Sequence, residues 1–257
     1  MKTNLLLRSL AKYFPKRIKS RGDFVGLMTG NLKEETSHIV LCLDLDEISL
    51  NEILKFDHKP DLILTHHPFI YGTRYRTLKY DEIKRELVNK VDELDIPVYS
   101  MHTNFDTGYR GMNDALAQKM GLINIKPLEF CSMARGGELA EEMEIHDFVK
   151  KFNKIMGLDY SLLVHAGKER IKTVAIVGGG GSRRYKEAQK EGYDLFISGD
   201  APHHVRREVI ANHYNYLEVS HEIERIFMPT MKELLLEIDP SLRIDIVDHE
   251  KLPELIK

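Results

Sequence analysis

Short apolar runs alternate with amphipathic stretches along the first half of the chain. Continuous apolar runs bounded by polar residues are typical of strands covered on both faces, whereas apolar residues at helical spacing predict helices with one buried face. The pattern predicts strands at 38–43, 61–65 and 96–101 and helices at 46–56 and 81–94. Strands that alternate with helices favour an α/β fold with largely parallel strands.

The pattern changes after Gly121, where the chain passes Pro127 and the Gly136-Gly137 pair. The alternation then begins again. Helices are predicted at 141–156 and 183–191, and strands at 173–177 and 195–198. We therefore expect two α/β units of similar make-up rather than one long sheet.

Composition narrows the class of protein. A chain of 257 residues suits one large domain or two small ones. Its net charge of -3, with 37 basic and 40 acidic residues interspersed, gives no nucleic-acid signature. No apolar stretch resembles a signal peptide or approaches membrane-spanning length. Cys42 falls in a predicted strand and Cys131 in a connection, so a disulfide framework is not expected and the cytoplasm is the expected compartment.

The most informative motif is Thr65-His66-His67-Pro68, in which two adjacent histidines close a predicted strand. Pro68 favours an extended backbone at His67, so the two rings should project to different sides of the chain. Neighbouring histidines in this arrangement do not easily share one ion. Each is instead suited to one member of a metal pair, with a neutral imidazole nitrogen as the donor.

A second cluster, His102-Thr103-Asn104-Phe105-Asp106, follows the next predicted strand. It should lie at the same sheet edge as His66 and His67, where α/β folds place their sites. Asp106 is therefore a candidate carboxylate ligand. The alternative is that Asp106 is only a turn residue or a cap on the approach to a helix.

A third cluster, Ser220-His221-Glu222-Ile223-Glu224, lies near the end of the chain. If the segment is helical, His221 and Glu224 share one face and can serve the same site, while Glu222 points elsewhere. Glu222 is the alternative ligand, and a solvated acidic helix start is the alternative to any site.

Together the three clusters supply nitrogen and oxygen donors without thiolate, which disfavours a zinc finger and suits a hydrolytic or substrate-binding pair of divalent ions. Zinc, iron, manganese, cobalt and nickel all accept such ligands. One carboxylate, for which Glu224 is the candidate, can bridge ions about 3.5–4 Å apart, and the open positions can hold water or substrate.

The glycine-rich run 178–182 can present backbone N–H groups to an anion. It lacks a Walker lysine, and Arg183 stands where the last glycine of a dinucleotide motif would be, so a close-packing turn capped by Ser182 is favoured. Asp200, His203 and His204 can line a cavity or support the ligands. An ordinary polar surface loop is an equal alternative.

The His66-His67-Pro68 motif, the 102–106 cluster with Gly111-Met112-Asn113-Asp114, the Ser198-Gly199-Asp200 turn and His221 with Glu224 resemble the GTP cyclohydrolase I type 2-like family, also called the Nif-three-like family. The resemblance covers nearly the whole chain. It implies two intertwined α/β lobes with mixed sheets: residues 1–126 completed by 216–257, and residues 127–215. It also implies a homo-hexameric ring.

Residue by residue, the resemblance places the ligands of two divalent ions on His66, His67, Asp106, His221 and Glu224, the last bridging both. The family name implies hydrolytic opening of the imidazole ring of GTP, with His102 or a histidine such as His203 as proton carrier. Hydrolysis of another nucleotide or phosphoester is a second enzymatic interpretation. A metal chaperone, or a ring-shaped interaction scaffold without turnover, is the alternative outside enzymes.

Overall fold

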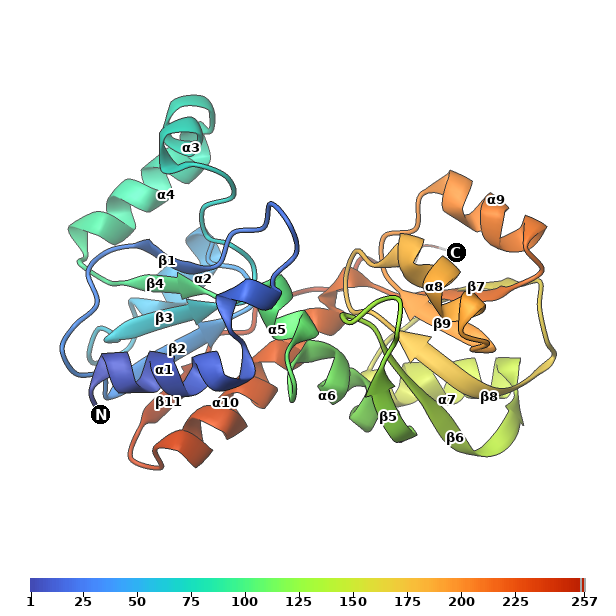
Figure 1. Cartoon of the computed structure of the whole chain (residues 1–257). Helices are drawn as coiled ribbons and strands as arrows, with labels where there is room; N and C mark the ends of the chain where they lie inside the picture. Colours follow the sequence, from blue (N-terminus) through green and yellow to red (C-terminus); the bar gives the residue numbers. More distant parts are fainter. Residues whose placement is uncertain (255, 257) are drawn as a thin grey trace. The chain divides into compact units, whose positions relative to one another are not determined.

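The computed structural model describes residues 1–254 and 256 as two compact units (Figure 1). Unit 1 comprises residues 1–109 and 227–250, and unit 2 begins at residue 110, runs to residue 226 and includes the described residues after 250. The chain thus leaves unit 1, builds nearly all of unit 2, and returns to unit 1.

Unit 1 contains a mixed sheet of five strands in the order β1-β4-β3-β2-β11. Its elements are α1 (Thr3–Tyr13), η1 (Lys16–Ile18), β1 (Gly26–Thr29), β2 (His38–Cys42), α2 (Glu47–Ile53), β3 (Leu62–Thr65), α3 (Arg74–Tyr80), α4 (Glu82–Glu93), β4 (Val98–Ser100), α5 (Thr103–Thr107), α10 (Phe227–Ile238) and β11 (Arg243–Ile246). The four strands β11, β2, β3 and β4 are parallel, and β1 is antiparallel to β4.

The centre of this sheet is covered on both faces, since every residue of β2 and β3 is buried. This explains why these strands read as unbroken apolar runs. Directly after β2, Asp46 starts α2 by accepting a hydrogen bond from the Ser49 backbone N–H, while the Ser49 hydroxyl accepts one from the Asp46 N–H. The strand exits are therefore fixed by buried packing and by a capping box.

Unit 2 contains a mixed sheet of six strands in the order β5-β6-β8-β9-β10-β7. Its elements are α6 (Met112–Lys119), β5 (Ile123–Pro127), β6 (Arg135–Glu144), α7 (Ile145–Met156), β7 (Leu162–His165), β8 (Arg170–Ile176), η2 (Ser182–Arg184), α8 (Tyr185–Lys190), β9 (Leu195–Ser198), α9 (His203–Ala211), β10 (Asn215–Glu218) and η3 (His221–Ile226). Strands β8, β9 and β10 are parallel, and the other pairings are antiparallel. The expected α/β fold with two mixed sheets is confirmed.

The helix expected at 141–156 begins only at Ile145, so its predicted start was wrong. Residues 141–144 instead form the end of β6, where Met143 and Glu144 pair with Ile171 and Arg170 of β8. The acidic residues in this stretch have good helix propensity, but pairing with a neighbouring strand overrides that weak preference.

The boundaries of the compact units differ from the lobes expected from the sequence. Residues 110–126 and 216–226 belong to unit 2. The pairings give the reason, because β5 pairs with β6 and β10 pairs with β9 and β7 inside the second sheet. The division into two lobes, residues 1–126 with 216–257 and residues 127–215, stays a prediction.

Both cysteines are buried and neither forms a disulfide. Within the described part of the chain, no helix has both the length and the apolar content that crossing a bilayer requires.

Asp194 is a buried polar residue of unit 2 that lies immediately before β9. Its carboxylate accepts hydrogen bonds from the backbone N–H groups of Lys172 (2.9 Å) and Thr173 (3.0 Å), from the Thr173 hydroxyl (3.0 Å) and from the Lys168 ammonium (2.5 Å). Burial opposes ionisation, but these bonds outweigh it and lower the pKa of Asp194. The ionised carboxylate thus ties β8 to the start of β9.

We expect Asp194→Asn to reduce the free energy of unfolding by about 1–3 kcal/mol at pH 7, because the amide leaves buried donors without an acceptor. A carboxyl whose pKa is lowered by folding stabilises the protein above its unfolded pKa of about 3.9, and this contribution is lost as the pH falls through the folded value. The difference between the proteins should therefore shrink below about pH 4. Urea denaturation measures it, with the exposed Asp147→Asn as control. Equal losses in both variants would contradict the assignment.

Candidate metal centre

His66 directly follows the last residue of β3, and its imidazole ring is buried and held in one orientation. Its Nδ1 lies 2.9 Å from the backbone carbonyl oxygen of Met101. Because a carbonyl only accepts hydrogen bonds, Nδ1 must carry the proton, which leaves the lone pair on Nε2. This Nε2 lies 3.6 Å from Oδ1 of Asp106.

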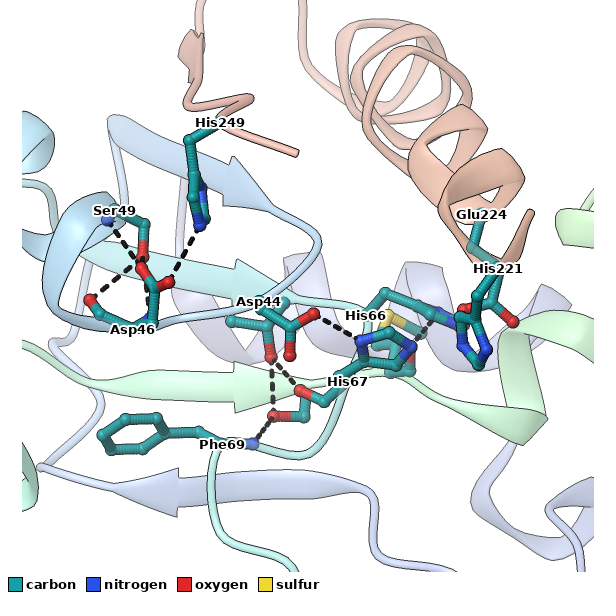
Figure 2. A network of polar contacts seen from close by, with 12 residues as sticks. Asp44, Asp46, Ser49, His66, His67, Phe69, His221, Glu224 and His249 are labelled. Atoms are coloured by element: carbon teal, nitrogen blue, oxygen red, sulfur yellow. Dashed lines mark hydrogen bonds and ion pairs between the residues drawn. The ribbon is translucent and has the colours of Figure 1, made fainter. Parts of the chain in front are cut away.

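His67 is held in a similar way by a carboxylate. Its Nδ1 lies 2.7 Å from Oδ2 of Asp44, and a dashed line marks this contact in Figure 2. Burial would raise the pKa of Asp44, but the hydrogen bond from His67 outweighs it and lowers that pKa. Asp44 was missed in the sequence, although its place directly after the predicted strand 38–43 is a signal that could have identified it.

His102 completes a group of three imidazoles in unit 1. One donor atom from each of His66, His67 and His102 lies within 4.8 Å of the others. Nδ1 of His102 lies 2.7 Å from Oδ1 of Asp23, a buried residue of the loop before β1. Burial of Asp23 opposes its ionisation, yet hydrogen bonds from His102 and Thr103 lower its pKa to about 2. No periodic pattern in the sequence marks Asp23.

Asp106 lies inside the short helix α5, and its side chain is buried. The N-cap position of this helix is His102, so Asp106 is not the cap that one interpretation of the sequence allowed. Its carboxylate faces His66 instead, at the distance given above. Three candidate ligands were expected in unit 1. Asp106 lies next to His66, and His67 follows His66 directly after β3.

Unit 2 brings His221 and Glu224 together in η3. The segment is a 3₁₀ helix rather than the α-helix considered from the sequence, and residues three apart in a 3₁₀ helix lie directly above one another. Nε2 of His221 is 3.1 Å from Oε2 of Glu224, whose side chain is buried. Glu222 turns away and accepts a hydrogen bond from the Ser220 hydroxyl. The shared face therefore belongs to His221 and Glu224.

Asp200 orients His221 from the exit of β9. Its Oδ2 lies 2.5 Å from Nδ1 of His221. The hydrogen bond with Glu224, together with Asp200, raises the pKa of His221 to about 9 despite partial burial. Asp200 has a left-handed φ of 53°, a conformation that aspartate tolerates better than most residues. Asp200 thus contacts the candidate ligand His221, and its role in supporting a metal ligand stays a prediction.

The glycine-rich run packs against the same pair. Gly179 has a φ of +62°, and a Cβ at this position would lie 1.9 Å from Oε1 of Glu224. Its carbonyl oxygen accepts hydrogen bonds from the Gly199 N–H (2.8 Å) and the Ser198 hydroxyl (3.0 Å). Ser182 donates to the backbone oxygen of Asp200 at 3.2 Å. The run is therefore a close-packing turn that leaves room for Glu224.

The four histidines share one feature across the two units. Each has its Nδ1 next to an oxygen acceptor, which fixes the orientation of the ring and leaves Nε2 as the candidate metal-binding atom. Metal-binding histidines usually donate their second ring nitrogen to a carboxylate or carbonyl in this way. The set offers imidazole nitrogen and carboxylate oxygen without thiolate, which fits zinc and the other first-row divalent ions.

Sequence and structure comparisons agree on the relatives of this chain. It is similar to proteins named GTP cyclohydrolase 1 type 2 homolog in Clostridium perfringens (30% identity over 229 residues, 86% of each chain) and Lactococcus lactis (27% over 248 residues, 95% of each chain). Its fold is similar to that of a Bacillus cereus protein related to NIF3, with a TM-score of 0.87 at 17% identity over 100% of this chain and 99% of the other.

A second solved structure, reduced HcgD from Methanocaldococcus jannaschii, has a TM-score of 0.81 at 24% identity over 96% of this chain and 97% of the other. The sequence model of one family, Duf34/NIF3 (NGG1p interacting factor 3), matches residues 1–253. The resemblance drawn from the motifs is thereby confirmed, and the chain belongs to the Duf34/NIF3 family.

Proposed function

We propose that this protein binds two divalent metal ions and uses them to hydrolyse a nucleotide. The ligands in this proposal are His66, His67, Asp106, His221 and Glu224, the set that the family resemblance assigns to one dinuclear centre. The observation that carries the proposal is the common orientation of the imidazoles, each held at Nδ1 so that Nε2 is the donor. The names of the relatives, homologues of a GTP cyclohydrolase, support a nucleotide substrate.

Bound divalent ions would polarise the substrate and lower the pKa of a water nucleophile to about 7. Side chains of the protein would bind the ions and hold the ligands in place. Asp44 and Asp200 hold the rings of His67 and His221 in place. Glu224, buried beside His221, has a second carboxylate oxygen that can serve the other ion.

His102 is suited to move a proton. Asp23 fixes its Nδ1, so Nε2 is the atom that exchanges the proton with substrate or water. Its ring centroid lies 5.4 Å from that of His66 and 5.8 Å from that of His67. This places His102 beside the ligands without requiring it to be one.

The proposal also includes a closed homo-hexamer, which comes from the family resemblance, and closed symmetry is usual for soluble oligomers. Two buried cysteines without a disulfide support a reducing compartment such as the cytoplasm.

The first prediction concerns metal content. After reconstitution with zinc or manganese, elemental analysis should find about two ions per chain, because the five ligands and open positions suit a pair. His67→Ala and His221→Ala should each lose bound metal, whereas the exposed His58→Ala should bind as the wild type does. A stoichiometry near zero, or unchanged binding in the His67→Ala, His221→Ala double variant, would remove the basis of the proposal.

A second prediction uses two glycines as a matched pair. Gly179 and Gly192 both have positive φ, so replacement by alanine strains both backbones, by about 1 kcal/mol. Only at Gly179 would the new Cβ meet Glu224, since nothing lies within 4 Å of a Cβ at Gly192. Metal affinity measured with a competing chelator should fall in Gly179→Ala and stay unchanged in Gly192→Ala. Equal affinities would show that Glu224 is not a ligand.

The third prediction tests hydrolysis. Nucleotides and phosphoesters are screened with metal-loaded and metal-stripped protein, and turnover should require metal. With the substrate found, Glu224→Gln should lose far more activity than Glu222→Gln, because Glu224 shares the His221 face and Glu222 contacts Ser220. Metal content measured in each variant separates lost binding from lost chemistry.

Equal activities in the two variants, or a larger loss for Glu222→Gln, would show that the carboxylate roles are assigned wrongly. Full metal loading without turnover on any of these compounds would favour a metal carrier over a hydrolase.

A further inference from the structure

Unit 2 has a cavity of about 420 Å³ between helices α8 and α9. This volume is within the range of small-molecule pockets, roughly 300–1,000 Å³. The cavity is lined by residues of η2, of the first turn of α8 and of the first two turns of α9. Its lining residues are Arg183, Arg184, Tyr185, Lys186, Glu187, His204, Val205 and Glu208.

Two of the cations in this lining are already neutralised by neighbours. Nζ of Lys186 lies 2.7 Å from Oε2 of Glu208, and Nη1 of Arg184 lies 3.0 Å from Oε1 of Glu187. These pairs leave one uncompensated arginine, so the lining carries a net positive charge even with His204 neutral.

The remaining cation is Arg183. Within the described part of the chain, no carboxylate lies within ion-pairing distance of its guanidinium or of the His204 ring. His204 belongs to the first turn of α9, a nine-residue helix whose N-cap, Pro202, supplies no side-chain acceptor. The helix dipole therefore adds to the positive potential that Arg183 creates.

The cavity lies at the edge of the second sheet that also carries the candidate ligands His221 and Glu224. The parallel strands β8, β9 and β10 are neighbours, and their carboxyl ends lead to the glycine-rich run, to Asp200 and to His221. The helices α8 and α9 start from the first two of these exits. In open α/β sheets, ligands bind beyond the carboxyl ends of the strands.

We propose that this cavity binds the phosphate groups of a phosphorylated small molecule, with Arg183 as its charged contact and His204 as a second hydrogen-bonding contact. A guanidinium offers paired N–H donors that match two phosphate oxygens, and an open helix N-terminus accepts an anion. This inference rests on the proposed function and deepens it, because it names phosphate as the part of the substrate that unit 2 recognises.

The test is calorimetric titration of the full-length, metal-stripped protein with inorganic pyrophosphate in the presence of a chelator. The wild type should bind one pyrophosphate per chain. Arg183→Gln should raise Kd about tenfold or more, the loss expected for a charged hydrogen bond, and His204→Gln should also raise it. Arg207→Gln is the matched control, because Arg207 is an exposed arginine of α9 that does not line the cavity.

Absent pyrophosphate binding would overturn the inference, as would equal weakening by Arg207→Gln, which would indicate diffuse surface charge. Equally tight binding of acetate would overturn the specificity for phosphate. Metal content is measured separately in the same preparations. Normal metal loading without pyrophosphate binding would refute only this inference, whereas pyrophosphate binding without metal uptake would refute only the dinuclear proposal.

Discussion

Parallel pairing of neighbouring strands is the constraint on which both groups of candidate ligands depend. In unit 1, β2, β3 and β4 run in the same direction, so the segments that follow them leave from one edge. Asp44, His66 and His102 each follow one of these strands. In unit 2, β9 and β10 deliver Asp200 and His221 in the same way. Residues far apart in sequence become neighbours because parallel strands end together.

The second requirement is that each imidazole presents a defined nitrogen. A neutral histidine carries its proton on either nitrogen, and only the unprotonated one can bind a metal. The acceptors at Nδ1, a carbonyl oxygen for His66 and a carboxylate for His67, fix both the tautomer and the ring orientation, and Asp200 fixes the ring orientation of His221. Losing such a partner typically costs 10–100-fold in metal affinity. Each group of candidate ligands therefore depends on a further carboxylate, Asp44 in unit 1 and Asp200 in unit 2.

Backbone shape is as important as side-chain chemistry at Glu224. This carboxylate is buried against Gly179, at a distance that leaves no space for a Cβ. For the glycine-rich run, the sequence favoured a close-packing turn over a nucleotide-binding loop. In the structure this run packs against the carboxylate of Glu224. The positively charged cavity lies instead between helices α8 and α9. The same strand exits thus carry candidate metal ligands and lead, through different residues, to the positively charged cavity.

The sequence alone determined the α/β class, the buried strands β2, β3 and β9 and the family, because apolar runs and ordered motifs are local signals. It also identified His66 and His67 as residues at a strand exit, and His221 with Glu224 as a pair on one helical face. Only the tertiary structure decided that residues 141–144 extend a strand, since pairing with β8 overrides helix propensity. It also decided which acceptors orient the histidines. Asp23 meets His102 across 79 positions of sequence, and no local pattern encodes a contact made by folding distant segments together.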